Sequence, residues 1–151
     1  MGIFETMRVS LSGLTAQRLR MDVISSNIAN VETTRSPEGG PYLRRQVIFQ
    51  AESAPPFAML LSNQLDGQRS APNASRGVAV VGIRTDPEAV REVYDPAHPD
   101  ADENGIVRYP DIDVVTEMAD LLAATRAYEA NVTVLDALKS MAMRALSIGR
   151  A

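Results

Sequence analysis

The sequence predicts a mainly α-helical protein with a small β-rich insert, in which two long terminal amphipathic helices pair as an antiparallel coiled coil. Three observations support this fold class. Apolar residues recur at helical spacing near both ends of the 151-residue chain. All nine prolines lie between residues 37 and 110, so they interrupt the middle and neither end. Aromatic residues make up 5% of the chain and tryptophan is absent, which favours a core of aliphatic side chains packed between helices.

The first predicted helix runs from Ile3 to about Asn30. Its apolar residues follow alternating steps of three and four, with Arg18 and Ser25 in two of the slots, and this spacing places them on one face of a helix. Glycine inside a helix costs about 1 kcal/mol relative to alanine, so Gly13 indicates a close helix–helix approach or a bend. One partner helix cannot cover this face completely, so we expect it to take part in a subunit interface. Its apolar residues are Phe4, Met7, Leu11, Leu14, Met21 and Ile28.

The second predicted helix begins after Asp113, a residue type that caps helix N-termini, and continues to Ile148 without glycine or proline. Glu117 and Asp120 lie near its N-terminus, where acidic side chains are favourable. At ~1.5 Å per residue this helix is roughly 50 Å long, which favours a coiled coil. It also exceeds the first helix, so we expect its last turns to contact another subunit. The apolar stripe includes Met118, Leu121, Tyr128, Val132, Leu135, Met141 and Leu146.

Residues 36–109 are predicted to form a β-rich insert between the two arms of a discontinuous helical domain, residues 1–35 plus 110–151. Short β-branched runs at 47–49, 78–83, 92–94 and 106–109 predict a small antiparallel sheet. Residues 52–76 have no clear periodicity and are expected to be a long mobile loop with an apolar anchor at 57–61. An ordinary α+β domain, with the helices packed on their own sheet, remains an open alternative.

The composition argues against most forms of chemistry. Cysteine is absent and His98 is the single histidine, so thiolate sites and histidine-based metal sites are excluded. Eleven of the nineteen acidic residues lie between Asp86 and Asp120, and a solvated acidic face is the ordinary explanation for them. The net charge of −4 argues against nucleic-acid binding, and the basic cluster of Arg35, Arg44 and Arg45 is too small to change this. We therefore expect no catalysis, cofactor, metal or small-molecule substrate.

Residues 100–111 match part of a calcium-binding loop pattern. Pro96 and Pro99 rule out the helix that must lead into such a loop. Asn104-Gly105 is a strong hairpin signal between two β-rich runs. A hairpin is therefore the preferred interpretation, and a calcium-binding module is the alternative that calcium titration would test.

Two segments resemble the flagellar rod and hook protein family. Residues 20–34, with Asn27, Ala29, Asn30 and Thr33 at the end of the first helix, resemble the N-terminal signature of that family. Residues 118–131 resemble its C-terminal segment, and the residues that carry this match are Arg126, Tyr128 and Asn131. The segments from Thr34 to Tyr42 and from Tyr94 to Gly105 look most like a proximal-rod subunit.

The resemblance implies a structural subunit of the bacterial flagellar basal body, polymerising through its terminal helices into the drive shaft. It also implies export through the flagellar type III apparatus without a cleaved signal peptide, and a place in the rod where it spans the periplasm. The implied partners are copies of itself, other rod proteins, and components of the membrane ring and export gate. The insert would set neighbour specificity, and the free monomer would have poorly ordered terminal helices. A coiled-coil adaptor or export chaperone that does not polymerise is the alternative.

Overall fold

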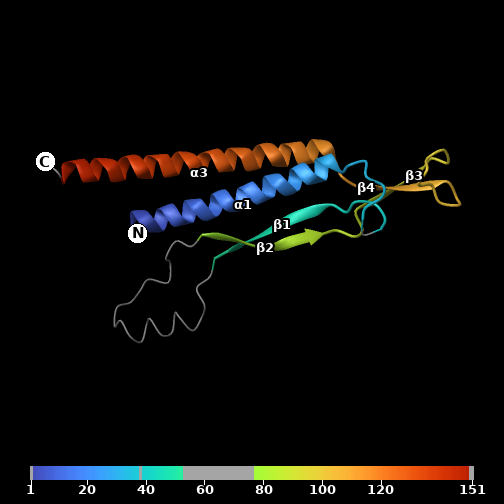
Figure 1. Cartoon of the computed structure of the whole chain (residues 1–151), viewed down its shortest axis with the longest axis horizontal. Helices are drawn as coiled ribbons and strands as arrows, with labels where there is room; N and C mark the ends of the chain where they lie inside the picture. Colours follow the sequence, from blue (N-terminus) through green and yellow to red (C-terminus); the bar gives the residue numbers. More distant parts are fainter. Residues whose placement is uncertain (1, 38, 53–76, 150–151) are drawn as a thin grey trace, which may run out of the picture. The chain divides into compact units, whose positions relative to one another are not determined.

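The computed structural model describes residues 2–37, 39–52 and 77–149 (Figure 1). The predicted loop at 52–76 lies outside these residues except for Glu52. The elements, in chain order, are α1 (Ile3–Ala29), β1 (Arg45–Ala51), β2 (Val78–Thr85), β3 (Val90–Tyr94), β4 (Ile106–Pro110) and α3 (Val114–Ile148).

The chain forms two compact units. The first unit consists of residues 1–16, 49–80 and 128–151, and the second of residues 17–48 and 81–127. Each unit contains a part of α1, a part of α3 and a part of the strands β1 and β2. The hairpin of β3 and β4 belongs entirely to the second unit.

Helix α1 ends where the sequence predicts, in a turn held by Asn30 and Thr33. The Asn30 side-chain Nδ2 donates to the carbonyl of Ser26 at 2.8 Å, and the Asn30 backbone N–H donates to the same carbonyl at 3.1 Å. Thr33 Oγ1 then donates to Asn30 Oδ1 at 3.2 Å. These side chains satisfy groups that the end of a helix leaves without an intrahelical partner, so the chain turns away after Ala29.

Helix α3 has the expected N-terminal cap. Asp113 Oδ1 accepts the backbone N–H of Val115 at 3.1 Å, and its other carboxylate oxygen accepts the hydroxyl of Thr116. These hydrogen bonds, with the Thr116 hydroxyl making the largest contribution, hold the pKa of Asp113 below its ordinary value of 3.8. The helix then continues for 35 residues.

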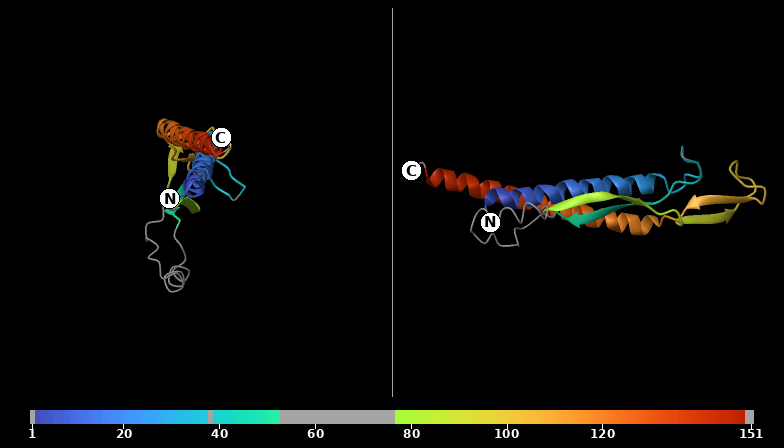
Figure 2. Two further views of the ribbon diagram at one scale, coloured as in Figure 1. Left: turned by 90° about the vertical axis from the view of Figure 1, so that its left-hand side faces the viewer. Right: turned by 90° about the horizontal axis from the view of Figure 1, so that it is seen from below.

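The prediction of one small sheet is wrong: the described strands form two separate two-stranded antiparallel sheets. Strands β1 and β2 pair with each other, and β3 pairs with β4 from Val90 opposite Pro110 to Tyr94 opposite Ile106. Figure 2 shows β3 and β4 as a hairpin of their own. Pro87, in the turn between β2 and β3, has no N–H to donate to a continuing ladder, and this ends β2 before β3 begins.

Within the subunit, the apolar stripe of α1 is only partly covered. Phe4 is 85% exposed and Leu11 is 49% exposed, and their expected place in a subunit interface stays a prediction. The helices pack closely where α1 has a small residue: a side-chain carbon added at Gly13 would lie 3.1 Å from Nδ2 of Asn131. This confirms the close helix–helix approach expected at Gly13. The buried residues of α1 are Ser10, Ala16, Val23, Ile24 and Asn27.

In the second unit, α1 and α3 run antiparallel. Asn27, near the end of α1, contacts Glu117 in the first turn of α3, with 3.1 Å between Asn27 Nδ2 and Glu117 Oε2. Met21, earlier in α1, contacts Thr125, later in α3, with 3.6 Å between Sδ and Oγ1. An Arg20–Asp120 ion pair of 3.0 Å also joins the two helices. The direction of pairing therefore agrees with the prediction, and the coiled coil itself stays a prediction.

Candidate functional site

Asn27 lies at the centre of a buried polar cluster in the second unit. Its Nδ2 donates to the carbonyl of Arg45 at 2.9 Å and to Glu117 Oε2 at 3.1 Å. Its Oδ1 accepts the backbone N–H of Arg45 at 3.1 Å and the hydroxyl of Tyr42 at 3.0 Å. An amide side chain has two N–H donors and two acceptor lone pairs, so the hydrogen-bonding capacity of Asn27 is fully used. One side chain thus joins the end of α1 to the start of β1 and to α3.

Glu117 is the largest of the fully buried side chains among the described residues. A buried carboxylate is costly unless it is paired and hydrogen-bonded. Arg44 provides the pairing: its Nε and Nη2 donate to Glu117 Oε1 at 2.8 Å and 2.6 Å. Asn27 provides the hydrogen bond to the other oxygen. Arg44 therefore balances the charge of Glu117 and Asn27 adds a hydrogen bond, and both residues are distant from Glu117 in the sequence.

Tyr42 extends the cluster toward the surface. Its hydroxyl lies 3.2 Å from Ser26 Oγ, and its backbone N–H donates to the carbonyl of Thr33 at 3.1 Å. The guanidinium carbon of Arg45 lies 5.4 Å from the centre of the Tyr42 ring, a cation–π distance. We call Asn27, Tyr42, Arg44, Arg45 and Glu117 the helix–strand junction.

The sequence predicted part of this junction. Asn27 belongs to the N-terminal motif, and the structure gives it a role beyond ending the helix. The sequence places Arg44 in a small basic cluster and Glu117 near the positive end of the α3 dipole, and it does not predict that the two pair. Glu117 offered a signal that could have been used: it stands four residues before Leu121 and seven before Ala124, on the side of α3 that is partly or fully buried. A lone acidic residue on such a face requires a buried partner.

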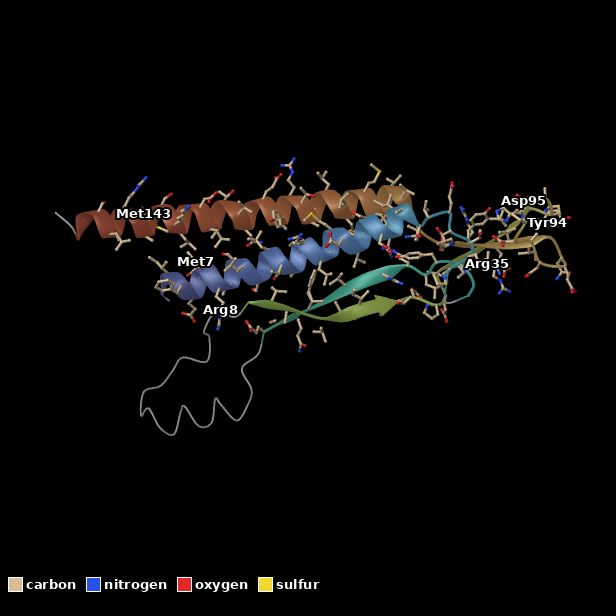
Figure 3. All side chains as sticks on the ribbon, in the orientation of Figure 1. Met7, Arg8, Arg35, Tyr94, Asp95 and Met143 are labelled. Carbon is tan, nitrogen blue, oxygen red and sulfur yellow. The ribbon has the colours of Figure 1, made fainter. Side chains whose placement is uncertain are left out.

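The second set of predicted site residues consists of apolar positions on the terminal helices. In the first unit, the end of α3 exposes Met141 at 52%, Leu146 at 64% and Ile148 at 78%. Met143, labelled in Figure 3, is 62% exposed on the same part of the helix. Phe4 exposes 85% of its surface on α1 in the same unit. These residues form the exposed apolar end of the first unit.

The remaining predicted residues are distributed between surface and partly buried positions. Met118 is 59% exposed, and Ala29 and Arg126 are also exposed. Asn131 is half-buried against Gly13. The other half-buried residues are Met7, Leu14, Met21, Ile28, Asn30, Thr33, Leu121, Tyr128, Val132 and Leu135.

The segment that matched the calcium-loop pattern, residues 100–111, holds the second half of the connection between β3 and β4 and then β4 itself. Gly105 has a φ of +73°, and its carbonyl accepts the N–H of Asp95 at 2.9 Å, as expected for a hairpin connection. Within the described residues, no group of three or more His, Asp or Glu side chains is arranged to hold a metal ion. No described helix is long and apolar enough to cross a membrane.

Two family models match the chain. Residues 7–35, which hold most of α1 and the turn after it, match the model of the flagella basal body rod protein. Residues 103–148, which hold β4 and α3, match the model of the flagellar basal body rod FlgEFG protein C-terminal region. The helix–strand junction draws Asn27 from the first match and Glu117 from the second.

Relatives align with nearly the whole chain. The flagellar basal-body rod protein FlgC of Bacillus subtilis is 46% identical, with 99% of this chain and 100% of the relative aligned. FlgC of Borreliella burgdorferi is 45% identical over 98% of each chain. The chain belongs to the FlgC family of flagellar basal-body rod proteins. FlgC of Salmonella typhimurium is more distant, at 36% identity over 99% of this chain and 100% of its own.

In a member of the FlgC family, the exposed apolar end and the helix–strand junction are expected to have different roles. The chain is a structural subunit of the flagellar basal-body rod and not an enzyme. Its functional surfaces are therefore contacts with other basal-body components, and an exposed apolar end fits that role. The helix–strand junction, in contrast, is buried and acts within the subunit.

Proposed function

We propose that this rod subunit polymerises through its terminal helices, joining copies of itself and neighbouring rod proteins into the proximal part of the drive shaft. The main support is the exposed apolar end of the first unit. Burial of a Leu, Ile or Met side chain is worth roughly 1.5–3 kcal/mol, so covering Met141, Leu146 and Ile148 would contribute substantially to association.

The length of α3 supports the same conclusion. In the first unit Gly13 lies against Asn131. For antiparallel helices of equal rise, moving ten residues along each helix from this contact brings Ile3 opposite Met141. Residues 142–148 then extend past the start of α1, and they include Met143, Leu146 and Ile148. A neighbouring subunit is the partner that would cover them.

Contacts of this type are expected to be heterologous, with different surfaces of two subunits meeting. Such contacts continue into an open helical filament when the rotation between subunits does not close a ring. Under this proposal, residues 1–35 and 110–151 form the polymerisation domain and residues 36–109 set neighbour specificity. The proposal also includes contacts with membrane-ring and export-gate components, a location in the rod where it spans the periplasm, and delivery through the flagellar export apparatus.

The proposal is tested by placing a charge on the exposed apolar end. We expect Leu146→Asp, or deletion of residues 141–151, to abolish swimming and incorporation into isolated basal bodies. Circular dichroism of the purified variant should remain close to that of the wild type, because Leu146 is 64% exposed. Ala130→Asp is the matched control: it places the same charge on an exposed residue of α3 in the first unit but outside residues 142–148, and it should still support swimming.

The possible outcomes separate the hypotheses. Normal rods built by Leu146→Asp would show that this end is not a polymerisation surface. Purified wild-type protein that binds rod partners without forming filaments in electron micrographs would favour an adaptor or export chaperone. A truncated protein that loses its β signal in circular dichroism would indicate that α3 belongs to the subunit's own core.

A further inference from the structure

We propose that Glu117 and Arg44 are a positioning pair: they set the direction in which the strands leave the two helices, and incorporation into the rod depends on that direction. This inference rests on the proposed function and adds residues to it. The pair belongs to the second unit, whereas the exposed apolar end belongs to the first.

Three segments of the chain meet at the pair, and directional bonds join them. Asn27 fixes the end of α1 to both backbone groups of Arg45, the first residue of β1. Arg44, one residue earlier, directs two N–H groups at one oxygen of Glu117. Apolar contacts are non-directional, whereas guanidinium–carboxylate hydrogen bonds constrain both distance and angle. The junction therefore defines the orientation of β1 relative to α1 and α3 within this unit.

The loop that leads into β1 does not provide this orientation by itself. Gly39 and Gly40 have φ values of +90° and +78°, and a side-chain carbon added at either would meet no atom within 4 Å. The turn is closed by its own backbone hydrogen bonds, from the N–H of Gly39 to the carbonyl of Ser36 at 3.0 Å and from the N–H of Ser36 to the carbonyl of Gly40 at 2.7 Å, and these bonds join it to neither helix. The side-chain hydrogen bonds that join the start of β1 to the helices involve Tyr42, Arg44 and Arg45.

Stability alone does not explain a buried ion pair at this position. Replacing both members of such a pair by neutral residues is often nearly neutral for folding, whereas removing one member leaves an uncompensated buried charge and is strongly destabilising. Orientation and stability can therefore be separated by substitution. Glu117→Gln keeps an acceptor for Asn27, and Arg44→Met keeps the volume of the side chain without its charge.

The experiment compares four variants in a strain that lacks its own copy of this subunit. Arg44→Met alone should lower the Tm strongly. The double variant Arg44→Met/Glu117→Gln should recover most of that Tm and still incorporate into basal bodies at least tenfold less than the wild type. Arg44→Lys keeps the charge but lacks the rigid, two-donor guanidinium group. This variant should therefore keep its fold and still incorporate poorly into basal bodies. The control is Arg20→Met/Asp120→Asn, which removes an ion pair between α1 and α3 in the same unit and should leave swimming unchanged.

A direct measurement of orientation accompanies the assembly assay. The chain has no cysteine, so spin labels at Ser25→Cys and Arg84→Cys report one distance between α1 and β2, and both positions are exposed. The distance distribution should broaden in Arg44→Lys and in the double variant, and it should stay narrow in the control. A residue that contributed stability alone would change the Tm without broadening this distribution in a folded variant.

Each result decides the question. Normal rod assembly by a variant with near-wild-type Tm would overturn the proposal. If neither Arg44→Lys nor the double variant keeps its fold, the pair is a stability element and the proposal is likewise wrong. Equal loss of assembly in the Arg20/Asp120 control would show that the effect is not specific to the Arg44–Glu117 pair, which would also contradict the proposal. Failure of the proposed function has a different signature: Leu146→Asp would build rods, whatever the junction variants do.

Discussion

The side chain of Asn27 makes four hydrogen bonds, and all four partners lie in other segments of the chain. Its amide pairs with the N–H and the carbonyl of Arg45 as a neighbouring strand would, and it also contacts Glu117 and Tyr42. An acidic or apolar replacement cannot offer this combination of donors and acceptors. Residue 27 of the motif therefore has to be asparagine to make all four hydrogen bonds, whereas ending the helix would not by itself require an asparagine there.

At the residue scale, Asp113 makes a pH-dependent contribution to stability. Its hydrogen bonds to Thr116 and Val115 lower its pKa in the folded state below the ordinary value of 3.8. The stabilisation is therefore present above that value and is lost as the pH falls through the lower folded pKa. We expect Asp113→Ala to lower the urea midpoint at pH 7 and to have little effect near pH 2. Asp113→Asn, which still accepts the Val115 N–H without titrating, is the control; an Ala effect of equal size at both pH values would contradict the prediction.

Gly13 gives a second prediction at this scale. A side-chain carbon there would lie 3.1 Å from the end of the flexible Asn131 side chain. Alanine should be close to neutral, because a higher helix propensity of about 1 kcal/mol offsets the tight contact. Leucine should destabilise by about 1–3 kcal/mol in urea unfolding, as overpacked sites do. Ser25→Leu, at an exposed position of α1, is the control, and equal stability of Gly13→Leu and the wild type would show that the helices can separate at this point.

At the scale of elements, the local signals in the sequence were sufficient to predict both helices and their ends. The absence of proline, the Asp113 cap and the Asn30 turn act within a few residues, so they can be read without knowledge of the fold. The same holds for the pairing of β3 with β4, although residues 95–105 connect them and not a two-residue Asn104-Gly105 turn. The strand positions were found for the same reason.

Pairings between distant residues could not be predicted from the sequence. Apolar spacing on α1 identifies a stripe that includes Phe4 and Leu11, but it does not identify the small and polar residues that are buried within the subunit, such as Ser10 and Ala16. Whether a face is covered depends on how closely the partner approaches, and Gly13 decides this in the first unit. Arg44 and Glu117 are 73 positions apart in the sequence. The residues around Glu117 indicate that it needs a buried partner, but they do not identify that partner as Arg44. The split into two sheets likewise depends on which strands meet.

At the scale of the whole molecule, burial is concentrated in one of the two units. Val23, Ile24, Val107 and Ala124 are buried in the second unit, together with Asn27 and Glu117 of the junction. The described buried residues of the first unit are few and mostly small: Ser10, Ala16, Gly77 and Leu138. Local opening requires less free energy where fewer apolar contacts are lost. The two units should therefore differ in stability before assembly.

Hydrogen exchange of the dilute monomer tests this difference. The poor order of the terminal helices that the sequence predicts for the free monomer is thereby restricted to their outer ends. We expect strong protection of amides at 20–29, 106–110 and 117–127, and fast exchange at 3–8 and 142–148, because isolated helix ends are marginal in water. This assigns the early part of α3 to the stable region and the late part to the labile one. Incorporation into rods should then protect 142–148, since a neighbour would cover Met143 and Leu146. Uniform protection of α3 through Ile148 in the dilute monomer would show that its last turns are stable without a neighbour, and that assembly does not order them.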